Sequence, residues 1–211
     1  MNAAANAQLW HRRLGYLNKR TLEFIQRRDG NGITFNGSLS NCDVCAVGKR
    51  HLLAHPNKVK NADIKASYWV VYGDLMGSFT PAAHGGYVYT SGSEYVGRTL
   101  RAIVRCLLVD SILPPNLWGE LMLTAAYICN QVSHSALKME TPHKVLYGEN
   151  TDLYHLKIIG ARTFVHTKDL NKLGHMSWEG MMCGFSENDS NSYRMWNLST
   201  RRAVEAKNVV F

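Results

Sequence analysis

Two cysteines stand at a spacing that suits a metal ion. Cys42 and Cys45 form a Cys-x-x-Cys pair, and such pairs commonly supply two of the four nitrogen or sulfur ligands of a tetrahedral zinc site. Two reduced structural cysteines in a turn are the alternative. The chain holds five cysteines, an odd and sparse number. This number argues against a disulfide framework and favours a reducing, intracellular compartment, either nucleus or cytoplasm.

Most of the positive charge lies near the start of the chain. The 211 residues carry a net charge of +8, and residues 1–60 hold ten Lys and Arg against three Asp and Glu, a net of +7. A localised basic segment favours a polyanionic partner, most simply DNA or another nucleic acid, whereas a solvated basic surface is the alternative. The candidate phosphate contacts are Arg12, Arg13, Lys19, Arg20, Lys49 and Arg50.

Short elements are expected to position these residues. Residues 8–28 have a helical pattern with a break near Gly15, and Asn18 can cap the second segment. Further along, the sequence predicts a strand at 33–35, a knuckle at 42–46, a polar linker at 56–65, and strands at 68–72 and 86–89.

The middle and the end of the chain differ in periodicity. Apolar residues recur at helical spacing over 98–109, with Arg98, Arg101 and Arg105 on the opposite side. A second helix is expected over 117–132, capped by Asn116, and a third runs from Pro142 to Tyr147 and ends at Gly148. Strands separated by polar turns are expected at 157–167, 180–185, 192–197 and 202–211, which suggests a small β-barrel or meander.

In order along the chain, these segments resemble the integrase region of copia-type retrotransposon polyproteins. Residues 9–16 (LWHRRLGY) resemble the LWHRRLGH opening of the family's pre-integrase zinc module, and residues 42–49 its Cys-x-x-Cys close. Residues 70–77 (VVYGDLMG) resemble the HSDLxGP-like start of the catalytic core. Later matches lie at 90–95, 98–100, 117–120, 125–127 and 156–161, and, for an SH3-like domain, at 178–185, 193–196 and 208–211.

The resemblance implies an α+β chain of three parts. Residues 8–55 would form a small helical, zinc-knuckle-like module of the GAG-pre-integrase type. Residues 66–148 would form a truncated, ribonuclease H-like remnant of the catalytic core with two to three helices, and an internal deletion near 89–98. Residues 152–211 would form a C-terminal SH3-like β-barrel.

The implied zinc site lacks one of its four ligands. The family uses two His and two Cys, and here His11, Cys42 and Cys45 match. The second His is replaced by Tyr16, whose neutral phenol is a poor zinc ligand. His51 or His55 is a candidate substitute, and zinc is expected to bind more weakly than in the family.

The implied catalytic site is also incomplete. The family's chemistry uses three carboxylates that hold two divalent metal ions. Asp74 matches the first, and only 19 residues separate it from Glu94. Glu94 matches either the Glu of a DNGSEY-like motif, with Thr90 in place of the Asp, or the third carboxylate before Arg98. Both alignments leave at most two carboxylates, so magnesium, the metal of the ancestral enzyme, is not expected to bind.

The chain is therefore interpreted as a degenerate integrase fragment, ancestrally active in DNA integration, that retains salt-dependent nucleic-acid binding. An active enzyme is one alternative, with Asp110 or Glu120 as compensating carboxylate or an intact integrase in trans. The others are a non-catalytic interaction module that self-associates through its paired helices and a poorly folded pseudogene product. No run of 18 apolar residues occurs, so no membrane partner is expected.

Overall fold

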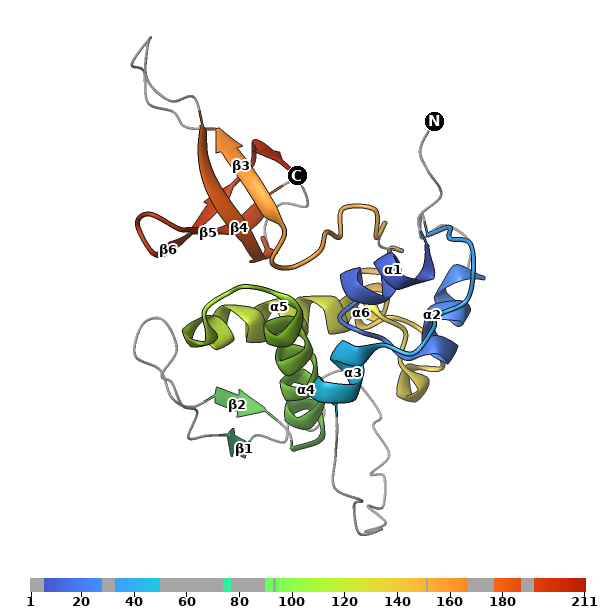
Figure 1. The fold of residues 1–211 in the computed structure, drawn as a ribbon. Helices are drawn as coiled ribbons and strands as arrows, with labels where there is room; N and C mark the ends of the chain where they lie inside the picture. The colour runs from blue at the N-terminus through green and yellow to red at the C-terminus, as the bar shows by residue number, and fades with distance from the viewer. Residues whose placement is uncertain are drawn as a thin grey trace.

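The computed structural model describes residues 6–27, 33–49, 74–76, 90–92, 94–150, 152–166, 177–186 and 192–211. In these residues, helices precede a five-stranded antiparallel sheet at the C-terminus, which makes the chain α+β (Figure 1). The linker expected at 56–65 and the strands expected at 68–72 and 86–89 lie outside the described residues.

The first predicted helix is divided into two. Helices α1 (Ala7–Arg13) and α2 (Lys19–Gln26) are separated at Gly15, where the backbone has a positive φ of 64°. Asn18 caps α2 as expected, because its side chain accepts a hydrogen bond from the Thr21 amide at 2.9 Å. The break near Gly15 is therefore confirmed, and it turns the chain back towards the start of α1.

The strand predicted at 33–35 is not formed. These residues have no regular structure, and the described part of the chain shows an isolated bridge nearby, between Asn6 and Asn36. Ile33 and Phe35 are nevertheless buried. Their alternation with Thr34 therefore reflects burial against the core. Helix α3 (Asp43–Gly48) follows at the position of the expected knuckle.

Two long helices form the centre of the molecule. Helix α4 (Glu94–Asp110) starts four residues earlier than predicted and packs against α5 (Trp118–Gln131). The predicted apolar face of α4 is buried, and Arg98, Arg101 and Arg105 are exposed on the other side. Asn116 does not cap α5, because it lies within the 3-10 turn η1 (Pro115–Leu117) that precedes the helix.

The chain segment between α5 and the sheet contains two short helical elements. They are the 3-10 turn η2 (Ser135–Leu137) and helix α6 (Pro142–Tyr147). The Thr141 side chain caps α6 by accepting from the Lys144 amide at 3.1 Å, and Gly148 ends the helix in a left-handed conformation. Both ends of α6 therefore lie where the sequence predicts them.

The C-terminal sheet has five strands, and every neighbouring pair is antiparallel. The strands are β3 (Arg162–His166), β4 (Ser177–Phe185), β5 (Tyr193–Asn197), β6 (Arg202–Ala206) and β7 (Val209–Val210). Their order in the sheet is β6-β5-β4-β3-β7. The strand predicted over 202–211 is divided in two, because the chain turns after Ala206 and its last strand pairs with β3 instead. A separate two-stranded ladder joins β1 (Asp74–Met76) to β2 (Thr90–Gly92).

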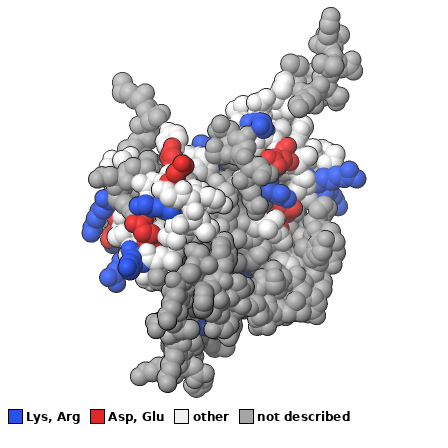
Figure 2. Space-filling view, turned by 180° about the vertical axis from the view of Figure 1, so that it is seen from behind, with Lys and Arg blue, Asp and Glu red and all other residues white. Residues whose placement is uncertain are grey.

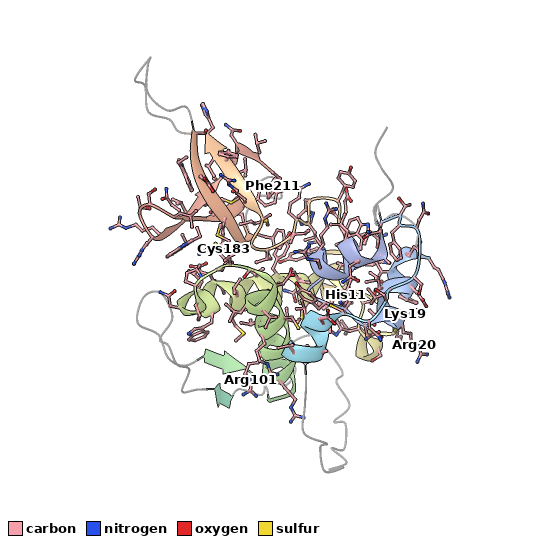
Figure 3. All side chains as sticks on the ribbon, viewed as in Figure 1. His11, Lys19, Arg20, Arg101, Cys183 and Phe211 are labelled. Atoms are coloured by element: carbon pink, nitrogen blue, oxygen red, sulfur yellow. The ribbon has the colours of Figure 1, made fainter. Side chains whose placement is uncertain are left out.

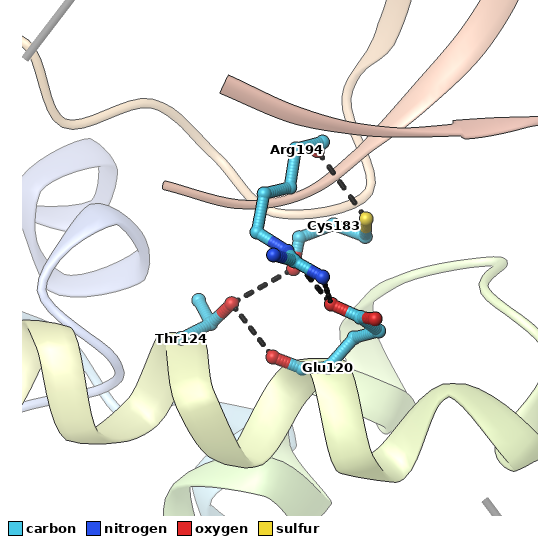
Figure 4. Close-up of polar contacts among 4 residues, drawn as sticks. All are labelled: Glu120, Thr124, Cys183 and Arg194. Atoms are coloured by element: carbon cyan, nitrogen blue, oxygen red, sulfur yellow. Dashed lines mark hydrogen bonds and ion pairs between the residues drawn. The ribbon is translucent and has the colours of Figure 1, made fainter. Parts of the chain in front are cut away.

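The sheet is attached to α5 by polar contacts as well as by packing (Figure 4). Arg194 Nε donates to Glu120 Oε2 at 2.7 Å, and a second guanidinium nitrogen contacts the same oxygen. Thr124 Oγ1 donates to the Cys183 carbonyl at 2.9 Å. Gly184 allows this approach, because a Cβ there would lie 2.5 Å from Thr124 Oγ1.

Removing one partner of the Glu120–Arg194 pair is expected to loosen the sheet from α5. The two side chains are 18% and 34% exposed, so the loss lies between that of a surface pair and that of a buried pair, about 1–2 kcal/mol in the free energy of unfolding. Glu120→Ala and Arg194→Ala, alone and combined in a double-mutant cycle followed by urea unfolding, measure the coupling. Fully additive losses would show that the ion pair contributes nothing.

A third polar contact of α5 is made to the chain segment before the sheet and depends on a neutral histidine. His155 Nδ1 lies 2.8 Å from the Asp152 carbonyl, and its Nε2 lies 2.8 Å from the Tyr127 hydroxyl on α5. Because a carbonyl only accepts, Nδ1 carries the proton, and Nε2 accepts from Tyr127. Burial lowers the pKa of His155, partly offset by the hydrogen bond to Asp152.

The lowered pKa of His155 predicts a loss of stability in mild acid. As pH falls below the ordinary value of 6.5, the unfolded chain takes up a proton before the folded chain does, so the free energy of unfolding decreases until pH passes the folded pKa. His155→Gln keeps an acceptor for Tyr127 and removes the titration. Urea unfolding between pH 5 and 8 should give a smaller pH dependence for the variant, and equal slopes would contradict the assignment.

The three expected parts contribute to one hydrophobic core. Trp10 of α1, Leu121 of α5 and Met182 of β4 belong to a single cluster of buried side chains. Figure 1 shows α5 between the sheet and α4, so α5 contributes to packing on both sides. In the part of the chain that the structure describes, no helix is long and apolar enough to span a membrane.

Candidate functional site

The structure brings together the three predicted zinc ligands. His11 lies in α1, Cys42 is the N-cap residue of α3, and Cys45 follows within that helix. Their ligand atoms all lie within 4.8 Å of one another. His11 is buried, and both cysteines are half-buried. Residues 31 positions apart in the sequence are thus placed as a cluster of one imidazole and two thiols.

Hydrogen bonding orients His11 as a metal ligand. Its Nδ1 lies 2.7 Å from the Leu17 carbonyl, so Nδ1 carries the proton and donates. The lone pair of Nε2 therefore faces Cys45 Sγ, at 3.2 Å. Metal-bound histidines typically donate their second ring nitrogen to a carbonyl or carboxylate in this way. Burial lowers the pKa of His11, which favours the neutral, ligating form.

The Cys45 thiol is protonated without a metal. Burial raises the pKa of Cys45 to about 12, although the positive charge of Lys49 opposes this rise. A metal ion must therefore displace the proton, which couples binding to proton release. One imidazole and two thiolates are a donor set that zinc accepts readily. The residues present therefore fit zinc but provide three of its four ligands.

Tyr16 does not act as the fourth ligand in this arrangement. Its ring meets His11 edge-on with the centroids 5.3 Å apart. Burial raises the pKa of its hydroxyl, and a hydrogen bond to Asp110 raises it further, against the effect of Arg12. The hydroxyl is thus engaged with the Arg12–Asp110 ion pair. His51 and His55, the predicted substitutes, lie outside the described residues.

The described candidates for phosphate contact differ in whether they are already paired. Arg12 pairs with Asp110 at 2.8 Å, and Lys49 donates to the Tyr16 carbonyl. Lys19 and Arg20 are exposed on α2, where Lys19 lies 4.0 Å from Glu23 (Figure 3). On the face shown in Figure 2, the described Lys and Arg side chains alternate with Asp and Glu. Arg50 lies outside the described residues.

Arg13 instead belongs to a basic cluster that the sequence analysis did not find. Its guanidinium lies 5.1 Å from the centre of the Trp10 ring, and its positive charge, after burial, lowers the pKa of Lys157. The Lys157 ammonium lies 5.9 Å from the Tyr154 ring and 5.7 Å from the Phe211 ring. We call Arg13, Lys157, Tyr154 and Phe211 the basic aromatic cluster. Because these residues lie far apart in sequence, no spacing signal could have found it.

The two remnant carboxylate positions are close along the backbone. Asp74 pairs with Gly92 in the β1–β2 ladder, and Glu94 opens α4 two residues later. Only the backbone of Asp74 and Glu94 is described. The two proposed compensating carboxylates are both engaged with arginines, Asp110 with Arg12 and Glu120 with Arg194.

Comparisons with known proteins give a family model and a relative. Residues 161–211, which begin one residue before β3, match the model of the Retroviral polymerase SH3-like domain. Over 121 residues, or 56% of its length, the chain is 30% identical to the Retrovirus-related Pol polyprotein from transposon TNT 1-94 of Nicotiana tabacum. The chain spans only 9% of that polyprotein. No solved structure gives a significant match.

Proposed function

We propose that this chain, a relative of the copia-type retrotransposon Pol polyproteins, binds nucleic acid through a zinc-supported fold and does not cut or join it. In this proposal residues 8–55 are a zinc module, residues 66–148 are a remnant of a ribonuclease H-like core, and the SH3-like region follows. The chain spans 9% of its tobacco relative, so the proposal rests on properties of the chain's own residues.

The basic aromatic cluster is the observation that carries nucleic-acid binding. Arg13 and Lys157 have no carboxylate partner among the described residues, and Arg13 Nε is buried without a hydrogen-bond partner. Two neighbouring cations without a counter-charge attract phosphate. Tyr154 and Phe211 are 55% and 46% exposed and offer faces on which bases can stack.

The proposed zinc ion would be held by His11, Cys42 and Cys45. When bound, it would supply a structural cross-link between α1 and α3 and no chemistry on a substrate. Its support is the donor set and the orientation of His11 Nε2 towards Cys45 Sγ. Arg13 is part of α1, so a metal ion that holds α1 in place would also hold Arg13 in place. The metal would therefore raise nucleic-acid affinity indirectly, without contacting the nucleic acid.

The proposed lack of catalysis follows from the carboxylates. A two-metal site needs acidic ligands that are free to approach both ions. Asp110 and Glu120 are each held by an arginine at hydrogen-bonding distance, so recruiting either would cost an ion pair. Asp74 and Glu94 alone are too few. Magnesium is therefore not part of the proposed function.

The test is the salt dependence of binding to labelled single- and double-stranded DNA, followed by fluorescence anisotropy. Each phosphate contact contributes close to one unit to the slope of log affinity against log salt. Combined Arg13→Gln and Lys157→Gln substitutions should weaken binding and reduce the slope by about 2. Arg101→Gln, an exposed arginine on α4 (Figure 3), is the matched control. Absence of wild-type binding at low salt would refute the proposal.

A further inference from the structure

The proposed zinc site has a vacancy in its ligand set. Tetrahedral structural zinc sites are closed by four protein ligands, and His11, Cys42 and Cys45 supply three. Tyr16, at the position of the missing histidine, is engaged with Arg12 and Asp110. A fourth ligand must therefore come from elsewhere in the chain or from water.

A third cysteine lies directly beside the cluster. Cys106 is in the C-terminal half of α4 and is 0% exposed. Its Sγ lies 3.9 Å from the Val44 carbonyl, between the two predicted cysteine ligands in sequence. A Cβ added to Gly48 would lie 2.6 Å from that Sγ, so the backbone of α3 approaches Cys106 closely at Gly48. The absence of a side chain at Gly48 permits this approach.

Helix geometry directs the thiols towards one another. Residues three apart in a helix share a face, so Cys42, Cys45 and Gly48 form one stripe along α3. Cys106 Sγ meets this stripe at Gly48, one turn beyond Cys45. The Cys106 thiol also hydrogen-bonds with Cys45 and is affected by the charge of Cys42. The ligand atoms of His11, Cys42 and Cys45 lie within 4.8 Å of one another. Cys106 Sγ lies beside this group and is not one of its three atoms.

We propose that Cys106 is the fourth zinc ligand, so that the site is His11 Nε2 with the sulfurs of Cys42, Cys45 and Cys106. This inference rests on the proposed zinc binding. Binding would release three thiol protons to solvent with no change of oxidation state. Three thiolates and Zn²⁺ carry a net charge of −1, which Lys49 offsets, since its charge already acts on His11, Cys45 and Cys106. The metal would then join the N-terminal helices to α4.

The sulfur coordination of the metal decides this inference. Zinc content of the full-length chain, purified without added metal, is measured first. X-ray absorption at the zinc edge then counts sulfur neighbours, and cobalt(II) substitution gives an independent sulfur-to-metal charge-transfer band. We expect one zinc per chain with three sulfurs and one nitrogen. Zinc with two sulfurs overturns the role of Cys106 and leaves the proposed zinc binding intact, whereas absence of zinc overturns both.

Variants separate the ligand from a neighbouring thiol. Cys106→Ser should leave two sulfurs on the metal and weaken zinc binding at least tenfold. Cys129→Ser is the matched control, since Cys129 is a half-buried cysteine on α5 outside the cluster. An unchanged sulfur count in Cys106→Ser would overturn the inference. If Cys106→Ser does not fold, the wild-type count alone still decides. A Cys45–Cys106 disulfide in the zinc-free, oxidised chain, found by mass spectrometry, would show that the two thiols are close to each other. The inference would still fail if zinc in the metal-loaded chain were bound by two sulfurs.

Discussion

Removing the proposed zinc ion is expected to unfold the N-terminal helices. Helix α3 has six residues and α2 has eight, well below the 12–15 residues at which isolated helices become marginally stable. Residues 33–42 between them contain no helix or strand. Structural zinc supplies roughly 10 kcal/mol in zinc-finger peptides. The effect here is smaller because Trp10, Leu14 and Leu22 also belong to the shared core.

The measurement is a thermal melt followed by circular dichroism, with and without a chelator. We expect the chelator to lower the unfolding temperature by at least 10 °C and to remove helical signal before the main transition. His11→Ala should reproduce the chelated curve in the presence of zinc. Identical curves with and without chelator would show that the His11, Cys42 and Cys45 cluster holds no structural metal.

The helices were predictable because their signals are local. The apolar stripe of α4, the Asn18 cap of α2 and the Thr141–Gly148 limits of α6 depend on neighbours within one or two turns. Two of the errors occurred where a distant segment decides the structure. Ile33 and Phe35 are buried against the core and do not form a strand, and the chain leaves β6 after Ala206 to pair with β3.

The candidate site shows the same division. His11, Cys42 and Cys45 could be identified from the sequence, because they match the His and Cys positions of the family's zinc module. The sequence did not predict which arginine is available to bind phosphate. Arg12 is paired with Asp110, 98 positions away, whereas its neighbour Arg13 lies near Lys157. Cys106 was missed for the same reason: its relation to Cys45 arises from the packing of α3 on α4. A sequence specifies such pairs only through the complete fold.

Replacing Asp110 with alanine is expected to separate α1 from α4. Asp110 accepts from Arg12 Nε at 2.8 Å, and its side chain is 17% exposed. It also hydrogen-bonds with the buried Tyr16 hydroxyl. Asp110→Ala would leave a guanidinium and a phenol without their acceptor. We expect a loss of about 2–3 kcal/mol, somewhat below the value for a fully buried pair because Arg12 is 35% exposed.

The same variant distinguishes a structural Asp110 from a catalytic one. Urea unfolding measures the stability, and Asp110→Asn, which keeps one acceptor oxygen, should lose less than Asp110→Ala. Arg12→Ala combined with Asp110→Ala should lose less than the sum of the single variants, since each single variant leaves a charge unpaired. If Asp110 were instead a metal ligand, Asp110→Asn would abolish a Mg²⁺-dependent nicking activity and leave the unfolding curve unchanged. The ion pair with Arg12 argues for the first outcome, in which Asp110 holds the N-terminal helices in place and takes no part in phosphoryl transfer.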